Sequence, residues 1–417
     1  MNDASEPGAA RPLRIAFVVQ RYGAEVNGGA ELHCRMLAER LARRDDVQSV
    51  TVLTTCAKDY ESWRNEYPAG NSQLNGVQVE RFETRLPRQG WLQDIASYAG
   101  TLGLAQHALD RLWLWSQGPV APGLLRRLAE VASQHDVFVF FTYLYHPTVH
   151  GLPLVPGKRL LIPTAHDEPA IRRSVFRAVF ELPEAIAFNS VEERELVQRR
   201  FAVDLARTDV VGCGVDEPPL VSGAPARERP YVLYLGRLAE PKGVATLATQ
   251  FLEFRRRQAD TRFESAQGSY LGRELELVFA GSGDRSLVPT HERLVLEGFV
   301  SDERRHELLA GAQVLAMPSR FESLSLVTLE AFMARVPVLV ERECEVTAGH
   351  VARSDGGLAY HGVDELCAQL ATLLSSRANR RRLAENGHRY VNATYAWPVV
   401  EQRLMKLIGR VAQAGAA

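Results

Sequence analysis

Short apolar runs alternate with helix-patterned segments along the chain, and this alternation limits the fold more than any other feature of the sequence. Residues 14–19 (RIAFVV) form an apolar run of the strand type, and residues 47–55 (VQSVTVLTT) form a second one. Between them lie residues 30–44 (AELHCRMLAERLARR), whose apolar side chains recur at helical spacing. A strand, a helix and a strand in this order favour a parallel sheet, so the sequence predicts an α/β fold.

The alternation starts afresh in the second half of the chain. Residues 217–229 (EPPLVSGAPARER) are rich in proline and polar residues, and the strand-like YVLYLG follows at 231–236. A length of 417 residues exceeds what one hydrophobic core usually supports. We therefore expect two Rossmann-like domains with parallel sheets that face a central cleft. The predicted divisions are a flexible N-terminus (1–12), an N-terminal domain (13–216), a linker (217–229), a C-terminal domain (230–390) and a closing helix (391–417) that packs back on the N-terminal domain.

The charge balance narrows the class of partner. The chain has 49 basic and 50 acidic residues and a net charge of -1, without the excess of positive charge typical of nucleic-acid binding. Small molecules or neutral polymers are the expected partners, and no nucleic acid is expected. Five dispersed cysteines without a C-x-x-C pair favour a reducing compartment. No run approaches the roughly 18 apolar residues of a spanning helix, and residues 1–12 lack a secretory signal pattern, so a cytoplasmic location is predicted.

The segment with the strongest chemical signal is residues 318–340 (PSRFESLSLVTLEAFMARVPVLV). A strand is predicted to end near Pro318, a loop carries Glu322, and a helix begins near Ser325 with Glu330 in its interior. In a doubly wound sheet, strand ends and helix N-termini meet at the ligand site, where free N–H groups suit a diphosphate. Glu322 would contact a polar group beside that diphosphate, and Glu330 could accept hydrogen bonds from a ribose diol. The alternative is a pair of solvated glutamates on an amphipathic helix.

Several motifs around this helix resemble glycosyltransferase family 4, whose members are retaining enzymes of the GT-B fold. The E-x7-E pattern of FESLSLVTLE is similar to the family signature, and LGRLAEPKG (235–243) is similar to its G-R-x-x-x-x-K-G segment. LVFAGSGD, LEGFVSD and AMPSRFES follow in the family's order. QRYGAEVNGGAELH, FFTYLYHPT, PTAHDEP and CEVTAGHVARSDGGLAY resemble bacterial enzymes that make surface polysaccharide or antigen glycans. The resemblance implies an N-terminal acceptor domain and a C-terminal donor-binding domain.

The resemblance also implies roles for single residues. Arg237 and Lys242 would bind the donor diphosphate and stabilise its charge as it leaves, which agrees with the need for pre-placed cations there. Glu322 would lie beside the transferred sugar, and Glu330 would hold the ribose. The alternative is that Arg237 and Lys242 are simply solvated side chains of a surface loop. The remaining donor contacts are expected from the backbone of Leu324, Ser325, Leu326 and Val327 and from a base pocket at Phe299 and Val300.

In the N-terminal half, Gly28 and Gly29 precede a predicted helix and resemble the family's glycine-rich loop near the donor phosphates. A glycine pair is also simply a common turn. His166 in PTAHDEP follows a predicted strand and matches the histidine that the family places under the reacting sugar. There it would support an oxocarbenium-like transition state, and closure of the domains would bring it opposite Glu322. The alternative is a structural or surface histidine.

Acceptor contacts are expected from the neighbouring strand ends. Asp167 could contact acceptor hydroxyls, and Tyr143, Tyr145 and His146 in FFTYLYHPT end a predicted strand. Their rings could stack on sugar faces or fill the core, and the sequence leaves both interpretations open.

Two positions depart from the family pattern. Ser325 replaces a glycine that is common after the first glutamate, and Arg335 occupies a position that is usually small. Neither departure affects the two glutamates.

The sequence therefore predicts transfer of a sugar, with retained configuration, from a nucleoside diphosphate sugar to a hydroxyl of a glycan or lipid-linked acceptor. The donor would be GDP- or UDP-linked, with no cofactor and no metal ion, and the pathway would be bacterial polysaccharide or glycoconjugate synthesis. The alternatives are a sugar-nucleotide epimerase and a non-catalytic sugar-nucleotide-binding protein. Residues 101–128 mix tryptophans with arginines, so they indicate either a peripheral contact with the inner face of the membrane or a packed insertion.

Overall fold

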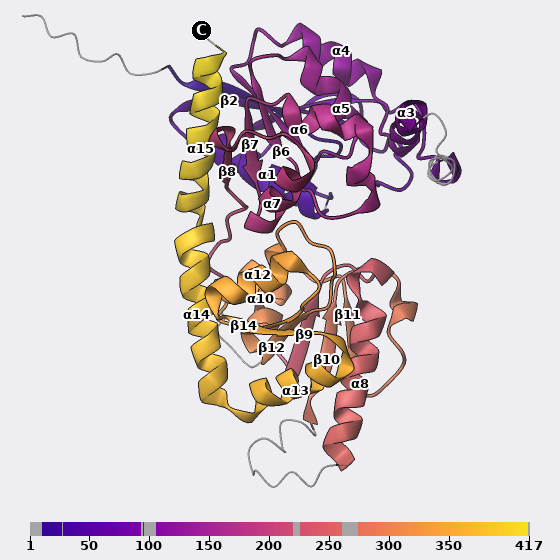
Figure 1. Ribbon diagram of the computed structural model, residues 1–417, viewed down its shortest axis with the longest axis vertical. Helices are drawn as coiled ribbons and strands as arrows, with labels where there is room; N and C mark the ends of the chain where they lie inside the picture. The colour runs from indigo at the N-terminus through magenta and orange to yellow at the C-terminus, as the bar shows by residue number, and fades with distance from the viewer. Residues whose placement is uncertain are drawn as a thin grey trace, which may run out of the picture. The chain divides into compact units, whose positions relative to one another are not determined.

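The strands form two separate sheets in the computed structural model (Figure 1). The structure describes residues 11–26, 28–92, 95, 106–219, 226–260 and 274–415. The chain divides into two compact units. Unit 1 comprises residues 1–211 and 401–417, and unit 2 comprises residues 212–400. The expected flexible N-terminus lies almost wholly outside the described residues, as does part of the expected linker. The domain boundaries drawn from the sequence stay predictions.

The sheet of unit 1 has the order β3-β4-β2-β1-β5-β6-β7-β8. Its strands are β1 (Leu13–Val18), β2 (Val47–Thr55), β3 (Gly70–Leu74), β4 (Val77–Phe82), β5 (Val137–Phe141), β6 (Arg159–Ile162), β7 (Ala185–Phe188) and β8 (Thr208–Val210). All neighbours pair in parallel except β3 and β4. The central strand β5 is buried at every position, as expected for a parallel strand with helices on both faces.

The β3–β4 hairpin was not predicted from the sequence. Its turn is Asn75-Gly76, and both residues have positive φ, 49° and 87°. An Asn-Gly pair between two short strands is a strong hairpin signal, because both residues tolerate the left-handed conformation of a tight turn. The signal was present in the sequence within QLNGVQVERF.

Unit 2 has a fully parallel sheet of order β11-β10-β9-β12-β13-β14. The strands are β9 (Tyr231–Leu235), β10 (Glu276–Ala280), β11 (Leu294–Gly298), β12 (Val314–Met317), β13 (Val338–Glu341) and β14 (Gly357–Tyr360). In chain order this is 3-2-1-4-5-6, the order of a Rossmann sheet, and the parallel strands of unit 1 repeat it. The predicted α/β class with two parallel sheets is therefore confirmed.

Helices cover these sheets (Figure 1). In unit 1 they are α1 (Gly29–Leu41), α3 (Gln106–Gln117), α4 (Pro122–Glu130), α5 (His146–Gly151), α6 (Arg177–Glu181) and α7 (Val191–Arg200). In unit 2 they are α8 (Val244–Asp260), α10 (Asp302–Gly311), α11 (Leu326–Met333), α12 (Glu345–Ser354), α13 (Gly362–Ser375) and α14 (Arg377–Tyr395). Short 3-10 turns are η1 (Leu152–Leu154), η2 (Pro169–Arg172), η3 (Ser174–Phe176), η4 (Leu205–Arg207), η5 (Glu240–Lys242) and η6 (Arg285–Leu287). Helix α8 packs against α13, while α11 and α12 pack against α14.

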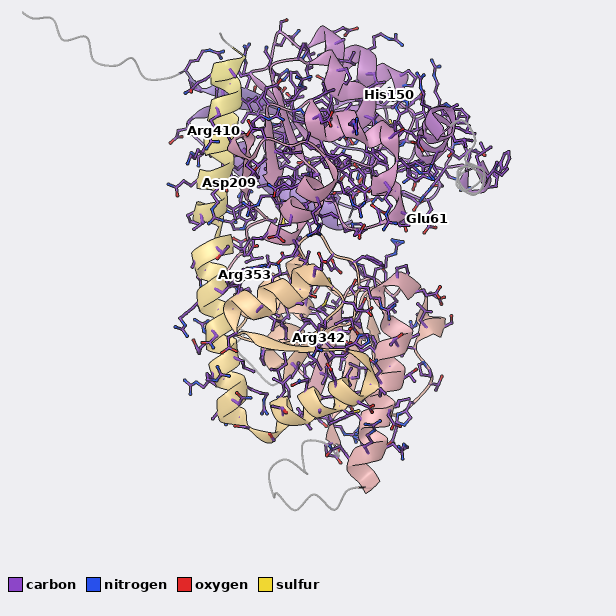
Figure 2. All side chains as sticks on the ribbon, viewed as in Figure 1. Glu61, His150, Asp209, Arg342, Arg353 and Arg410 are labelled. Carbon is purple, nitrogen blue, oxygen red and sulfur yellow. The ribbon has the colours of Figure 1, made fainter. Side chains whose placement is uncertain are left out.

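The last helix, α15 (Trp397–Ala414), contributes its residues from 401 onward to unit 1. Its apolar side chains Leu404, Leu407, Ile408 and Val411 are buried. Arg403 donates a hydrogen bond to the carbonyl of Val210 at 3.2 Å, and Arg410 donates one to Ala206 at 3.1 Å. Figure 2 shows Arg410 and Asp209 of β8 on the same edge of unit 1. The end of the chain is therefore attached beside β8.

The apolar and aromatic residues of 101–128 divide between core and surface. Trp113 and Leu114 of α3 belong to the core of unit 1, whereas the side chain of Trp115 is 41% exposed. Because Trp113 packs into the core, a membrane contact by this segment, one of its two interpretations, would not involve the ring of Trp113. Residues 101–105 of this segment lie outside the described residues.

Candidate functional site

The candidate site in unit 2 lies where the strand order reverses. Strands β9 and β12 are neighbours, and the chain leaves β9 toward β10 on one side and β12 toward β13 on the other. The loops that follow such a pair separate from each other, which opens a crevice at the carboxyl ends of the strands. The loop after β9 carries Arg237 and Lys242, and the loop after β12 carries Glu322.

A salt bridge joins these two loops. The Nζ atom of Lys242 lies 2.7 Å from Oε1 of Glu322, and the side chains are 38% and 14% exposed. Gly243 follows Lys242 with a φ of 71°. A Cβ atom at this position would lie 2.6 Å from the carbonyl oxygen of Pro318, at the end of β12. The loops approach so closely that only glycine fits both the conformation and the space.

The loop that carries Arg237 is fixed to the loop after β10. Leu238 donates its N–H to the carbonyl of Ser282 and accepts the N–H of Asp284, both at 2.8 Å. The approach is close, since a Cβ atom on Gly281 would lie 1.9 Å from the carbonyl oxygen of Gly236. The glycines of LVFAGSGD therefore permit the backbone pairing that holds the Arg237 loop.

A buried hydroxyl supports the same loop. Tyr234 on β9 donates a hydrogen bond to the carbonyl of Arg237 at 2.8 Å. Burial, and to a smaller extent the Glu322 carboxylate, raises the pKa of Tyr234. The hydroxyl therefore keeps its proton at physiological pH and remains a donor to the loop.

The N-terminus of α11 is built from a strained residue and a buried histidine. Ser325 has a φ of 62°, so the position that is commonly glycine in the family needs a left-handed backbone. The Ser325 hydroxyl lies 2.9 Å from that of Thr328. Nε2 of His350 on α12 lies 3.0 Å from the carbonyl oxygen of Leu324 and fixes the loop before the helix. The first N–H groups of a helix have no partner within it, so those of Leu326 and Val327 can bind an anion.

Glu330 faces a different element from Glu322. It pairs with Arg305 of α10, and its side chain is 21% exposed. Burial raises the pKa of Glu330, while the Arg305 guanidinium opposes that rise. The two glutamates of the E-x7-E pattern are thus held by separate cations, Glu322 by Lys242 and Glu330 by Arg305.

The predicted base-pocket residues follow β11. The ring of Phe299 is 72% exposed, and Val300 is partly buried. Gly298 just before them has a φ of 76° and turns the chain out of the strand. Phe299 lies in the connection between β11 and α10, and Arg305 lies in the first turn of α10. An exposed aromatic ring and the partner of Glu330 therefore come from one segment at the carboxyl edge of the sheet.

Unit 1 has its own reversal of strand order, between β1 and β5. After β1, Oε1 of Glu31 accepts hydrogen bonds from Gln20 Nε2 at 2.8 Å and from Arg21 Nη2 at 2.6 Å. A Cβ atom on Gly28 would lie 2.1 Å from Oε2 of Glu31, whereas Gly29 has open space. A side chain at Gly28 would therefore displace the Glu31 carboxylate of a buried ion pair, and Gly29 begins α1.

His166 lies in the loop after β6. Its Nε2 is 3.6 Å from Oε2 of Glu168, and Glu168 accepts a hydrogen bond from the Tyr143 hydroxyl at 2.7 Å. Asp167 pairs with Arg200 at 2.8 Å and is about half exposed. A chain of polar contacts therefore runs from His166 into the core of unit 1.

Glu193 fixes the backbone next to His166. Its carboxyl group accepts the N–H of Ala165 and, at 2.5 Å, the N–H of Asn189, while Ser190 caps α7 by accepting the N–H of Glu193 at 3.1 Å. The side chain is buried, and burial raises the pKa of Glu193 to about 8. Sequence reasoning missed this residue, although S-x-x-E at 190–193 is a capping-box pattern.

The aromatic residues at the end of β5 differ in environment. Tyr143 has 0% exposure and packs against Phe176 and Phe180, so its ring fills the core and presents no face to a sugar. Tyr145 packs edge-on against Trp63. Burial, with a smaller contribution from His150, lowers the pKa of His146 to about 3, so this ring is neutral at physiological pH.

Arg21 and Glu31 are the other residues that sequence reasoning missed. The glutamate follows Gly28-Gly29 in the first turn of α1, a position that favours a carboxylate, but nothing in the sequence links it to Arg21. Within the described ranges, His, Cys, Asp and Glu side chains do not gather in groups of three that could hold a metal ion. In the same part of the chain, no helix combines the length and apolar character needed to cross a bilayer.

Comparison with known proteins assigns part of the chain to a family. Residues 229–376 match the family described as glycosyl transferases group 1. The chain is 29% identical over 245 residues to an MMP alpha-(1->4)-mannosyltransferase of Mycolicibacterium hassiacum, with 57% of each chain covered. It is 29% identical over 173 residues to an alpha-D-kanosaminyltransferase of Streptomyces kanamyceticus, with 40% of this chain and 42% of the relative covered. The alignments thus span about half the length of these relatives.

The fold is shared with solved structures of low sequence identity. Sucrose-phosphate synthase of Thermosynechococcus elongatus superposes with a TM-score of 0.68 at 17% identity and covers 96% of this chain and 100% of its own. Anabaena HepE in complex with UDP and glucose gives 0.65 at 15% identity, covering 95% and 99%. The predicted resemblance and the predicted fold are confirmed: residues 229–376 of the C-terminal unit match the group 1 glycosyl transferases, and the two sheets have the GT-B fold of these structures.

Proposed function

We propose that this chain is a retaining glycosyltransferase that moves a sugar from a nucleoside diphosphate sugar to a hydroxyl group of a glycan or lipid-linked acceptor. The observation that carries the proposal is the Lys242–Glu322 pair at the point where the strand order of unit 2 reverses. A sugar-nucleotide donor needs a cation for its diphosphate and an acceptor of hydrogen bonds for its sugar, and this pair supplies both side by side.

In this proposal the diphosphate binds between Lys242, Arg237 and the N-terminus of α11. Loss of the sugar leaves additional negative charge on the diphosphate, and groups fixed in advance around it lower the barrier. The salt bridge between Lys242 and Glu322 is partly exposed, so opening it for a ligand costs about 1 kcal/mol or less. Lys242 can then contact phosphate while Glu322 accepts hydrogen bonds from the sugar.

The nucleoside end of the donor is proposed to lie toward β11. Glu330 would accept hydrogen bonds from the ribose hydroxyls, and Phe299 would stack on the base, with Val300 beside it. Arg305 supports this role because it holds the Glu330 side chain in place and opposes the rise in its pKa that burial causes. The proposed base is guanine or uracil, and a thermal-shift screen with GDP and UDP decides between them, since a ligand of the folded state raises the melting temperature.

Retention is proposed to follow from departure and attack on the same face of the sugar. In retaining glycosidases, a double displacement uses two carboxyl groups about 5–5.5 Å apart on either side of the sugar. Glu322 is held by Lys242, and Glu330 faces α10 and Arg305, so the E-x7-E pair does not supply that arrangement. The leaving phosphate oxygen would take the acceptor proton. His166 is proposed to support the charge of the transferred sugar, with Glu193 fixing its loop.

The test is donor turnover by the whole chain. Wild-type protein is incubated with UDP-glucose and GDP-mannose, with and without a mixture of glycan acceptors, and nucleoside diphosphate release is measured. Glu322→Gln should lower release at least a hundredfold, while Glu343→Gln, an exposed acid paired with Arg320, should retain it. Equal turnover by Glu322→Gln and wild type rejects the proposal.

Product analysis separates the rival activities. An epimerase converts the donor sugar without acceptor and releases no nucleoside diphosphate. A non-catalytic binding protein shows the thermal shift but neither product. Transfer to a lipid-linked acceptor would place the protein at the inner face of the membrane, and flotation with liposomes that contain such an acceptor tests that location.

A further inference from the structure

A cavity lies in unit 2, at the opposite edge of its sheet from the proposed donor site. It has a volume of about 670 Å³ and is formed by the residues before β12, the residues before β13 and the first turns of α14. The donor-site residues follow the carboxyl ends of β9 and β12, whereas this cavity lies at the amino ends of β12 and β13. Its charged lining consists of Arg335, Arg377, Arg380, Arg381 and Glu385.

Arg335 enters this cavity at a conformational cost. Its φ is 55°, in the left-handed region that glycine occupies freely and that other residues avoid. The nearest carboxylate, Glu385, lies 3.7 Å from Arg335 Nε, and each side chain is 48% exposed. A loose and exposed pair of this kind contributes little to folding, so it does not account for the arginine.

The other three arginines lie where the helix dipole disfavours them. Arg377, Arg380 and Arg381 lie in the first turns of α14, and no acidic residue is present in its first turn. The N-terminus of a helix carries a partial positive charge, so added cations raise the local potential. Arg380 is buried and donates hydrogen bonds to the carbonyls of Leu373 and Leu374 at 2.7 and 3.0 Å. Within the described part of the chain, Arg377 and Arg381 have no carboxylate partner.

These observations concern different elements but the same cavity. Arg335 comes from the turn between α11 and β13, and the others come from α14, so two separate elements bring four arginines to one space. Arg380 is bound to the carbonyls at the end of α13, whereas among the described residues no such contact explains Arg335, Arg377 and Arg381. One carboxylate, Glu385, faces them. The resulting excess of positive charge calls for a ligand with several negative charges. Guanidinium groups match the oxygen geometry of phosphate in particular, and the volume is that of a small-molecule site.

We propose that this cavity is a binding site for a phosphate-bearing anion, separate from the nucleotide site. The ligand is either a soluble phosphorylated compound or the phosphate of a lipid headgroup, which share the same chemistry. The proposal does not depend on the reaction at the donor site.

Calorimetric titration of the whole chain with inorganic pyrophosphate tests the site. Two binding events are expected, one weakened by Lys242→Ala and the other by the double variant Arg377→Ala/Arg381→Ala. Each lost charged contact should weaken the second event about tenfold or more. The matched control is Arg382→Ala/Arg389→Ala, which removes the same charge from the same helix. Neither residue lines the cavity, and Arg382 pairs with Asp355. A single event that responds only to Lys242→Ala, with no vesicle effect, overturns the proposal.

Flotation with vesicles of phosphatidylcholine, with and without phosphatidylglycerol, distinguishes the sources. Recruitment by the anionic vesicles that is lost in the Arg377/Arg381 variant and kept in its control assigns the phosphate to a lipid. Arg335→Gly supplies an independent check, since glycine relieves the left-handed conformation. That variant should melt at a higher temperature than wild type and yet bind the anion at least tenfold more weakly. An Arg335→Gly variant with unchanged affinity removes Arg335 from the site.

Discussion

Replacement of Gly243 by alanine should damage the donor site and the stability of unit 2 together. The left-handed φ of 71° costs an L-residue about 1–2 kcal/mol. The new Cβ atom would also lie 2.6 Å from the carbonyl oxygen of Pro318, a backbone atom that cannot rotate away. Alanine also raises the free energy of unfolding by about 0.4–1 kcal/mol, because it restricts the unfolded chain. The net loss is therefore about 1–3 kcal/mol, and relief of the contact moves Lys242 away from Glu322.

The measurement combines urea unfolding with nucleotide binding. Gly409→Ala on α15 is the matched control, because its Cβ atom meets nothing within 4 Å and alanine in a helix stabilises it by about 0.5–1 kcal/mol. The two substitutions should therefore change the unfolding midpoint in opposite directions. Nucleoside diphosphate affinity should fall about tenfold in Gly243→Ala alone. Wild-type stability and affinity in Gly243→Ala would refute the argument that the two loops are fixed by this close approach.

Three further perturbations test other parts of the structure. Glu193 has a pKa of about 8 in the folded chain and about 4.3 when unfolded, so its contribution to stability is full below pH 4.3 and is lost as the pH rises through 8. The stability of wild type relative to Glu193→Gln should thus decrease between pH 5 and pH 8 in urea titrations, and a constant difference would contradict the raised pKa. Glu31→Ala leaves the buried guanidinium of Arg21 without its carboxylate, so it should destabilise the chain by about 3–5 kcal/mol in the same assay. Glu25→Ala removes the exposed partner of Lys58 and should cost about 1 kcal/mol or less. Glu330→Gln should weaken binding of a nucleoside diphosphate about tenfold and leave pyrophosphate affinity unchanged, and an equal loss for both ligands in calorimetry would show that Glu330 does not contact the ribose.

Periodicity predicted the architecture well where strands are buried on both faces. The apolar runs at 14–19 and 231–236 became β1 and β9, the strands from which each reversal of order starts. The hairpin of β3 and β4 was missed because β3 is an exposed edge strand with no apolar pattern, so only its Asn-Gly turn marks it.

Motif spacing could indicate the proposed donor residues because they are local in the sequence. The Glu322 and Glu330 pattern lies within one loop and one helix, and strand order then places Lys242 beside the first glutamate. The partners that complete the site come from distant segments: Arg305 for Glu330, and His350 for the carbonyl of Leu324. Such pairings depend on which helices pack together, and single-sequence periodicity carries no information about that. At Ser325 the structure explains a sequence pattern. Its positive φ shows why glycine suits this position, and φ is not visible in the sequence.

The central claim is that Lys242 and Glu322 form a site for the diphosphate and sugar of a nucleotide sugar. Calorimetric titration of UDP and GDP into wild type, Lys242→Ala and the exposed-lysine control Lys406→Ala tests it most directly. We expect one of the two nucleotides to bind wild type and Lys406→Ala with equal affinity and Lys242→Ala at least tenfold more weakly. Undiminished nucleotide binding by Lys242→Ala would contradict the account.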